Sequence, residues 1–145
     1  MAISEPTWAV VATVDENPAV VQAFVAWHLS LGAGHVFLYC DRPDDPVQDA
    51  VAHLSQVTVV ACDDAHWLRI CKSRPDRHQI RQVRNARDAY ARTDMDWLVH
   101  IDADEFLWSQ VPIAQHLSAV SNAADCLVIP VAERVHLAGA RNESI

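Results

Sequence analysis

Apolar residues along the chain cluster into short runs, separated by polar turns and by longer amphipathic stretches. These runs lack the alternation of a strand with one solvent-exposed face, so they predict strands buried on both sides. Four such strands are expected: Trp8–Val14, His35–Cys40, Val57–Ala61 and Trp97–Ile101. A fifth strand is expected over Asp125–Val131.

Helices are predicted between these strands. Pro18 suits the first turn of a helix over Ala19–Leu31, which Gly32 and Gly34 would end. The other predicted helices are Val47–Leu54, Asp76–Arg92 and Pro112–Val120, whereas residues 62–75 are expected to be irregular.

This alternation of strands and helices favours an α/β fold. We expect a single domain over residues 1–145, with a mostly parallel sheet flanked by helices on both sides. Ligands of such sheets bind beyond the carboxyl ends of the strands, so that edge is where a site is expected.

Composition narrows the class of protein. The chain has 145 residues, 51% of them hydrophobic, as in an ordinary globular domain. Its net charge of -8 argues against a nucleic-acid partner. Neither a transmembrane segment nor a signal peptide is visible in the sequence. The four cysteines form no C-x-x-C pair, so we expect reduced thiols and a cytoplasmic location.

The positive charge is concentrated in one segment. Eight of the eleven Lys and Arg residues lie between Arg69 and Arg92, which predicts either an anion-facing element or a merely solvated helix. On a helical projection one stripe is basic, and the opposite side is expected to face the sheet. The stripe holds Arg77, Arg81, Arg84 and Arg92, and the opposite side holds Ile80, Val83, Ala86 and Tyr90.

Acidic residues follow three of the predicted strands directly: Asp15, Asp41 and Asp102. Aspartate is common in turns, so each position alone is also explained by turn chemistry. Because parallel strands bring their carboxyl ends to one edge, the three carboxylates are expected to converge there.

The densest cluster of carboxylates is Asp102, Asp104 and Glu105, at the end of a predicted buried strand. Close carboxylates repel one another, and a divalent cation removes that conflict. Mg²⁺ or Mn²⁺ is the expected cofactor, because these ions often use one or two protein carboxylates together with phosphates and waters. An exposed acidic turn without a metal is the competing interpretation.

Four motifs, in order over residues 7–108, resemble those of GT-A glycosyltransferases of the family-2-like group. VHIDADEFL (99–107) is similar to their D-x-D-E-F segment, and WHLSLGAGHVFLYCD (27–41) to their H-x-x-L-G stretch. DEN (15–17) matches an acidic turn after the first strand, and QVRN (82–85) matches an Arg-Asn helix.

The resemblance implies a nucleotide-diphosphate sugar as donor and transfer of its sugar to an acceptor hydroxyl of unknown identity. Asp104 would bind the metal, and Asp102 would contact the metal or the donor ribose. Asp15 and Asp41 would line the nucleotide pocket. Arg84 or Asn85 would orient the donor.

The chain departs from the family pattern after the acidic motif. Family members continue well beyond it and carry the acceptor site and the catalytic base there, so the resemblance implies a C-terminally truncated, donor-binding domain. Titratable candidates in the remaining segment are Glu133, His136 and Glu143, and none lies in a recognisable motif. The catalytic base is therefore unassigned.

Three alternatives stay open at this level. A haloacid-dehalogenase-like phosphohydrolase also carries Asp-x-Asp, but on its first strand. A docking module could use the basic helix over Arg77–Arg92 to bind an anionic partner or a membrane surface peripherally. An inactive fragment is the third alternative. A shortened sheet would expose apolar surface, so homo-oligomers are also expected.

Overall fold

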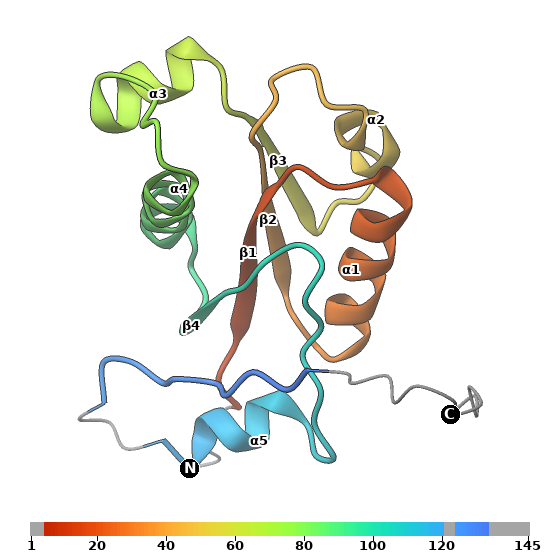
Figure 1. Ribbon diagram of the computed structural model, residues 1–145. Coiled ribbons are helices and arrows are strands. Elements are labelled where there is room, and N and C mark those ends of the chain that lie inside the picture. Colours follow the sequence, from red (N-terminus) through yellow and green to blue (C-terminus); the bar gives the residue numbers. More distant parts are fainter. Residues whose placement is uncertain (1–4, 121–123, 134–145) are drawn as a thin grey trace, which may run out of the picture.

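The computed structural model describes residues 5–120 and 124–133. Its centre is a four-stranded sheet with the strand order β3-β2-β1-β4, in which every pairing is parallel (Figure 1). The strands are β1 (Trp8–Val14), β2 (His35–Cys40), β3 (Val57–Ala61) and β4 (Trp97–His100). All four were predicted from their apolar runs, and the α/β class is confirmed.

Burial follows the position of each strand in the sheet. The central strand β1 is buried along its whole length, and β2 is buried at every residue after His35. The two outer strands are only half-buried, because each has one neighbour. The expectation of double-sided burial therefore holds for the two central strands and is wrong for the outer two.

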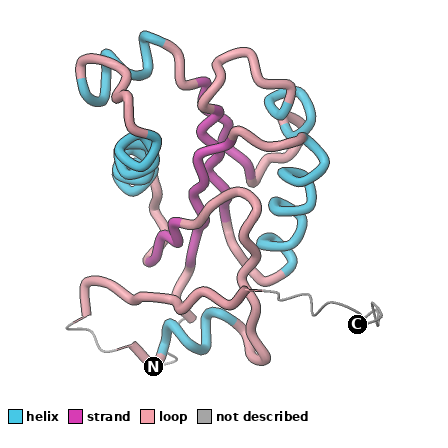
Figure 2. Tube along the Cα trace, in the orientation of Figure 1, coloured by secondary structure: helices cyan, strands magenta, loops and turns pink. Residues whose placement is uncertain are grey.

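Helices cover both faces of the sheet, as Figures 1 and 2 show. α1 (Pro18–Ser30) and α2 (Val47–Val51) pack on one face, where Val10 and Leu38 belong to the larger core. α3 (Asp64–Cys71) and α4 (His78–Arg92) lie on the other face, above a smaller core. A short helix, α5 (Ile113–Ser118), follows β4.

Local sequence explains where α1 begins and ends. Asn17 caps the helix by accepting a hydrogen bond from the backbone of Ala19 at 2.9 Å, and Pro18 occupies the first turn. At the other end Gly32 adopts φ 97°, a left-handed conformation that favours glycine. The amides of Gly32 and Ala33 then close the helix on the carbonyls of Leu29 and His28.

Two elements differ from the prediction. Residues 64–71, expected to be irregular, form α3, whose cap is Asp63: its carboxylate accepts from the His66 amide at 2.8 Å. The fifth strand over Asp125–Val131 does not form, and the described residues 124–133 contain no helix or strand. Pro130 has no amide hydrogen to give to a ladder, and Val128 remains 83% exposed.

The orientation predicted for α4 is also wrong. The side that faces the sheet carries Arg81, Asn85 and Ala89, whereas Ile80, Val83 and Tyr90 are exposed. Of the four residues predicted to face the sheet, Ala86 packs against the smaller core. Apolar residues normally face the core, so this reversal requires that the buried polar groups find partners inside the fold. They do, as shown below, and no buried side-chain nitrogen or oxygen in the described residues lacks a hydrogen bond.

None of the described helices has both the length and the apolar composition needed to cross a membrane.

Candidate functional site

The carboxyl ends of the parallel strands meet along one edge of the sheet. The pairing of Val14 with Cys40 brings Asp15 and Asp41 to neighbouring positions. β4 pairs Val11 with His100, so Asp102 follows at the level of Thr13 on β1. The convergence of these strand-end acids on one edge, predicted from the sequence, is therefore observed.

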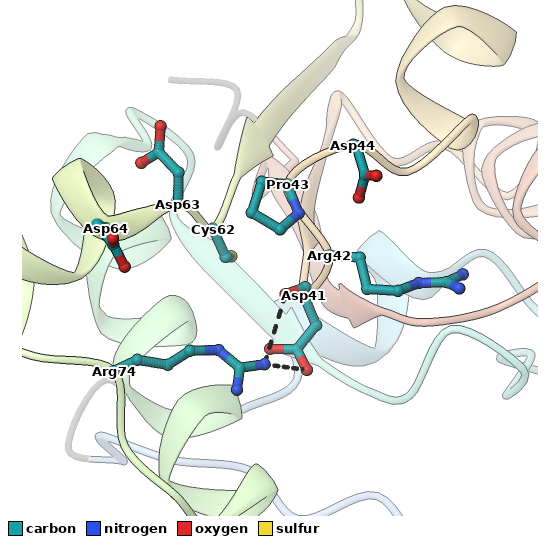
Figure 3. A pocket seen from close by; sticks show the side chains of 8 residues that line it. All are labelled: Asp41, Arg42, Pro43, Asp44, Cys62, Asp63, Asp64 and Arg74. Atoms are coloured by element: carbon teal, nitrogen blue, oxygen red, sulfur yellow. Dashed lines mark hydrogen bonds and ion pairs between the residues drawn. The ribbon is translucent and has the colours of Figure 1, made fainter.

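A pocket of about 400 Å³ opens at the ends of β2 and β3 (Figure 3). It is lined by Asp41, Arg42, Pro43, Asp44, Cys62, Asp63, Asp64 and Arg74. Four of these side chains are acidic and two are basic. A pocket with this excess of carboxylates accepts hydrogen bonds from hydroxyl and N–H groups and repels phosphate.

Asp41 forms the floor of the pocket and is almost fully buried. Arg81 reaches it from α4 with two hydrogen bonds of 2.8 and 2.9 Å, and Arg74 donates a third at 2.9 Å. The remaining Arg81 donors bind the carbonyls of Pro75 and Asp76. A buried carboxylate is tolerated when its charge is paired and its oxygens are hydrogen-bonded, and both conditions are met here. Asp41 thus lines this pocket with its carboxylate already engaged by two arginines.

Asn85 lies beneath this edge and is completely buried. Its amide nitrogen donates to the Thr13 hydroxyl at 3.0 Å, and its amide oxygen accepts from His66 Nε2 at 2.9 Å. The predicted role of Asn85 was to orient a donor. The structure gives its side chain partners inside the protein instead, where it joins α4 to β1 and α3.

Asp15 lies at the surface, with its side chain 57% exposed. Its carboxylate forms an ion pair of 2.9 Å with Arg42, which also pairs with the buried Asp45 at 3.1 Å. Arg42 therefore links the loops that follow β1 and β2. Exposed pairs of this kind contribute little to stability, so Arg42 can leave Asp15 at small cost.

The acidic turn Asp102–Glu105 leaves the end of β4 with its three carboxyl-bearing residues exposed and Ala103 buried. Asp102 accepts a hydrogen bond from the Gln82 amide of α4, and the Glu105 carboxylate accepts from the Asp102 backbone at 3.3 Å. This donor set of exposed carboxylates fits a hard divalent cation that takes its other ligands from phosphate and water. Within residues 5–120 and 124–133, no three His, Cys, Asp or Glu residues form a group able to hold a metal by themselves.

The basic segment is used largely inside the fold. Arg74 and Arg81 pair with Asp41, and Arg69 and Arg92 pair with Asp88 at 2.6 and 3.0 Å. Half of its eight basic residues thus neutralise two aspartates. Arg84, predicted to orient the donor, lies exposed on α4, and in the described part of the chain no acidic residue pairs with it.

The partners of Asp88 and burial together shift the pKa values of several groups. Burial by itself would raise the pKa of Asp88, but hydrogen bonds from Arg69 and Tyr39 outweigh it and hold that pKa below its ordinary value. Burial and the hydrogen bond to Asp88 raise the pKa of Tyr39. Burial also raises the pKa of Cys40 and of Cys62, each to about 12, so neither thiol is a ready nucleophile.

Several residues of this edge were missed as site residues from the sequence: Arg74, Gln82, Thr13 and His66. Arg74 and His66 fall in the stretch expected to be irregular. The available signal of a helix start in that stretch was Asp63, which lies three residues before His66 and caps the helix by accepting from its amide. Gln82 lay within the quoted QVRN motif without a role. Spacing along a single helix cannot show which side chain spans to another strand.

Comparison with known proteins found no relative: no protein-family model, no curated protein and no solved structure matches the chain. Any function assigned to this edge therefore rests on its own chemistry.

Proposed function

We propose that the chain is the donor-binding domain of a glycosyltransferase, which holds a nucleotide-diphosphate sugar through Mn²⁺ or Mg²⁺. The observation that carries this proposal is an arrangement along one sheet edge: an acid-lined pocket at β2 and β3, and an exposed Asp-x-Asp turn at β4. Only β1 separates β2 from β4, so these two strands lie about 10 Å apart across the sheet.

The chemistry of the two parts suits different portions of one ligand. The pocket has carboxylates that can accept from ribose hydroxyls or base N–H groups. It does not suit a diphosphate, whose charge the carboxylates would repel. The acidic turn has the same repulsion until a cation binds, after which it attracts phosphate. Asp15 and Asp41 then belong to the nucleoside end, and Asp102 and Asp104 to the diphosphate end.

Asp102 and Asp104 would hold the cation. When bound, the cation supplies Lewis-acid stabilisation of the departing diphosphate. Gln82 fixes Asp102 through its hydrogen bond, which aligns one ligand before the metal arrives. Arg84 projects exposed from α4, one turn from Arg81, and is the cation proposed to meet the donor's phosphates.

Transfer also requires a base that removes the proton of the acceptor hydroxyl. Glu133 is exposed, and His136 and Glu143 lie outside the described residues. The proposal therefore covers donor binding and leaves the base unassigned.

Calorimetric titration tests the proposal directly. UDP and GDP are titrated into the full chain with Mn²⁺ and, separately, with EDTA. We expect one nucleotide to bind only with Mn²⁺, and Asp104→Asn to weaken that binding at least about tenfold. The matched control is Asp94→Asn, which removes an exposed carboxylate at the opposite end of β4.

Two results would contradict the proposal. Binding that persists in EDTA would exclude the metal-bridged diphosphate, and absence of binding for both nucleotides would exclude the donor site. Metal-dependent release of phosphate from a simple phosphomonoester, lost in Asp102→Asn, would favour the phosphohydrolase alternative.

A docking function is the second candidate, and one observation favours it. The outer face of α4 carries Arg77, Arg84 and Arg87, which have no acidic partner among residues 5–120 and 124–133, beside the exposed Ile80 and Val83. Such a face suits an anionic membrane surface. Co-sedimentation with vesicles containing phosphatidylserine, abolished by salt and by Arg84→Gln together with Arg87→Gln, would support it; no co-sedimentation at low salt would exclude it.

A further inference from the structure

Trp27 and His28 of α1 contact the segment that directly follows the acidic motif, although some eighty residues separate the two in sequence. Trp27 Nε1 donates to the Leu107 carbonyl at 2.7 Å. His28 Nε2 accepts from the Leu107 amide at 3.3 Å. Two consecutive residues of one helix thus take both backbone groups of a single residue, which lies three positions after Asp104.

The protonation state of His28 follows from its partners. Its Nε2 faces an amide donor, so it must be the unprotonated nitrogen, and Nδ1–H then donates to the Phe24 carbonyl at 2.8 Å. The ring is completely buried, and that burial lowers the pKa of His28. The neutral imidazole is therefore a fixed acceptor for Leu107.

Aromatic packing reinforces the same contact. The ring of Phe106 stacks on His28 with centroids 6.1 Å apart, and it meets Phe24 and Trp27 edge-on at 6.2 and 6.4 Å. Leu107 itself enters the larger core. Residues 106 and 107 are consequently held against α1 by both main chain and side chains.

The acidic turn is held at one end by this contact and at the other end by β4. Upstream, Ile101 still pairs with β1, its amide donating to the Val11 carbonyl at 3.3 Å. Between these anchors lie Asp102, Asp104 and Glu105, exposed carboxylates that repel one another and favour a spread-out loop. A turn anchored at both ends limits how far the three carboxylates can move apart.

We infer that Trp27 and His28 are positioning residues: by binding the Leu107 backbone they hold the Asp102–Glu105 turn in the geometry that receives the divalent cation. This inference rests on the proposed function. It explains why the Trp-His pair of α1 belongs to a site from which it is separated by some eighty residues. Neither side chain touches the ligand in this role.

Trp27→Phe is the principal test, because it keeps an aromatic ring beside Phe106 and removes the indole N–H together with the five-membered ring that carries it. Trp27 is 40% exposed, so the variant is expected to fold. His28→Phe is the second variant. The control is Ser30→Ala, which removes a hydrogen bond of 2.6 Å to the Trp27 carbonyl on the same helical turn without touching Leu107.

Two readouts separate positioning from simple stability. Hydrogen–deuterium exchange of residues 102–107 reports the anchor, and we expect it to accelerate about tenfold in Trp27→Phe and to stay unchanged in Ser30→Ala. Mn²⁺-dependent binding of the nucleoside diphosphate, with free Mn²⁺ followed by electron paramagnetic resonance, reports the site. We expect about tenfold weaker Mn²⁺ affinity in Trp27→Phe, with an unchanged thermal midpoint within the difference seen for the control.

The outcomes distinguish the two levels of the proposal. If the wild type binds Mn²⁺ and nucleotide and Trp27→Phe binds both equally well, the positioning role is overturned while the proposed function stands. Faster exchange with unchanged Mn²⁺ affinity overturns it in the same way, because the anchor would then be structural only. If the wild type shows no Mn²⁺-dependent binding, the proposed function fails and this inference fails with it.

Discussion

The two faces of the sheet hold their helices by different means. Against α1 and α2 the contact is apolar: Val10, Leu38 and Phe24 are each fully buried. Against α4 the sheet meets Arg81 and Asn85, which are buried because Asp41 and Thr13 receive their hydrogen bonds. One face is therefore stabilised mainly by removing apolar area from water, and the other by a polar network whose value depends on every member being paired.

The same difference distinguishes contacts that only stabilise the fold from contacts that also form the candidate site. The larger apolar core also reaches the carboxyl edge, through Val14, Cys40 and Ala103, but the polar network continues into the pocket itself through Asp41 and Arg74. A change in the network should therefore affect both stability and ligand binding. A change in the apolar core away from the contact between α1 and Leu107 should affect stability alone.

The largest expected effect is that of Asp41→Ala. It leaves the Arg81 guanidinium buried without its counter-ion, which costs about 3–5 kcal/mol of unfolding free energy. Urea denaturation measures this loss. The double variant Asp41→Leu with Arg81→Met is the control, because it removes both charges and should recover most of the loss. A loss below about 1 kcal/mol for Asp41→Ala would mean that the network contributes no more than a surface ion pair.

On the apolar face, Leu38→Ala should cost about 3 kcal/mol, since it empties a fully buried site. Urea denaturation at low and high salt distinguishes it from Asp41→Ala. We expect the cost of Leu38→Ala to be independent of salt, because no charge changes. The variant should also retain nucleotide affinity at temperatures where it is folded, and a selective loss of affinity would break the comparison between the faces.

Acid should act on His28 and on Asp88 in different pH ranges. On the apolar face burial lowers the pKa of His28 below 6.5, so the unfolded chain takes up the proton first and stability falls as pH drops below about 6.5. On the polar face the pKa of Asp88 lies below its ordinary 3.8, so its contribution is present above that pH and is lost only as pH falls further. One proton changes the slope by at most about 1.4 kcal/mol per pH unit.

Two variants distinguish the contributions of His28 and Asp88 to the pH dependence of stability. His28→Phe should reduce the slope just below pH 6.5, to which His35 and His100 also contribute because burial lowers their pKa values. Asp88→Asn should reduce only the slope below about pH 4. Chemical denaturation over pH 3–8 measures both. If Asp88→Asn altered the slope near pH 6 instead, the assignment of that slope to buried histidine would be wrong.

The same contrast explains how much the sequence could predict. Continuous apolar runs mark β1 and β2 whatever surrounds them, and Pro18 and Gly32 mark the ends of α1. The orientation of α4 could not be read this way, because a helical projection assumes that arginine faces water. Arg81 faces the sheet only because Asp41, forty residues earlier, neutralises it.

The candidate site, too, could be predicted only in part from the sequence. The strand-end acids and their common edge could be predicted, since parallel topology alone brings Asp15, Asp41 and Asp102 together. The partners that occupy or support them could not, because Arg74 and Trp27 act across distant segments that no local spacing connects. The fifth strand failed for a related reason: an apolar run needs a neighbour with which to pair, and Pro130 interrupts its ladder.

The smallest expected effects concern how one helix on each face ends. Gly32 ends α1 at φ 97°, and its missing Cβ would meet nothing closer than Trp8 Nε1 at 4.0 Å, so Gly32→Ala should cost about 1 kcal/mol through backbone strain alone. Lys72 ends α3 at φ 74°, the corresponding strain already present on the other face. Lys72→Gly should therefore raise stability by a few tenths of a kcal/mol to about 1. Thermal denaturation of both variants measures the two changes in stability. The stability of Gly32→Asn should lie between that of the wild type and that of Gly32→Ala, because asparagine tolerates this conformation. Equal signs for Gly32→Ala and Lys72→Gly would show that packing around the two helix ends, rather than the left-handed backbone, sets their cost.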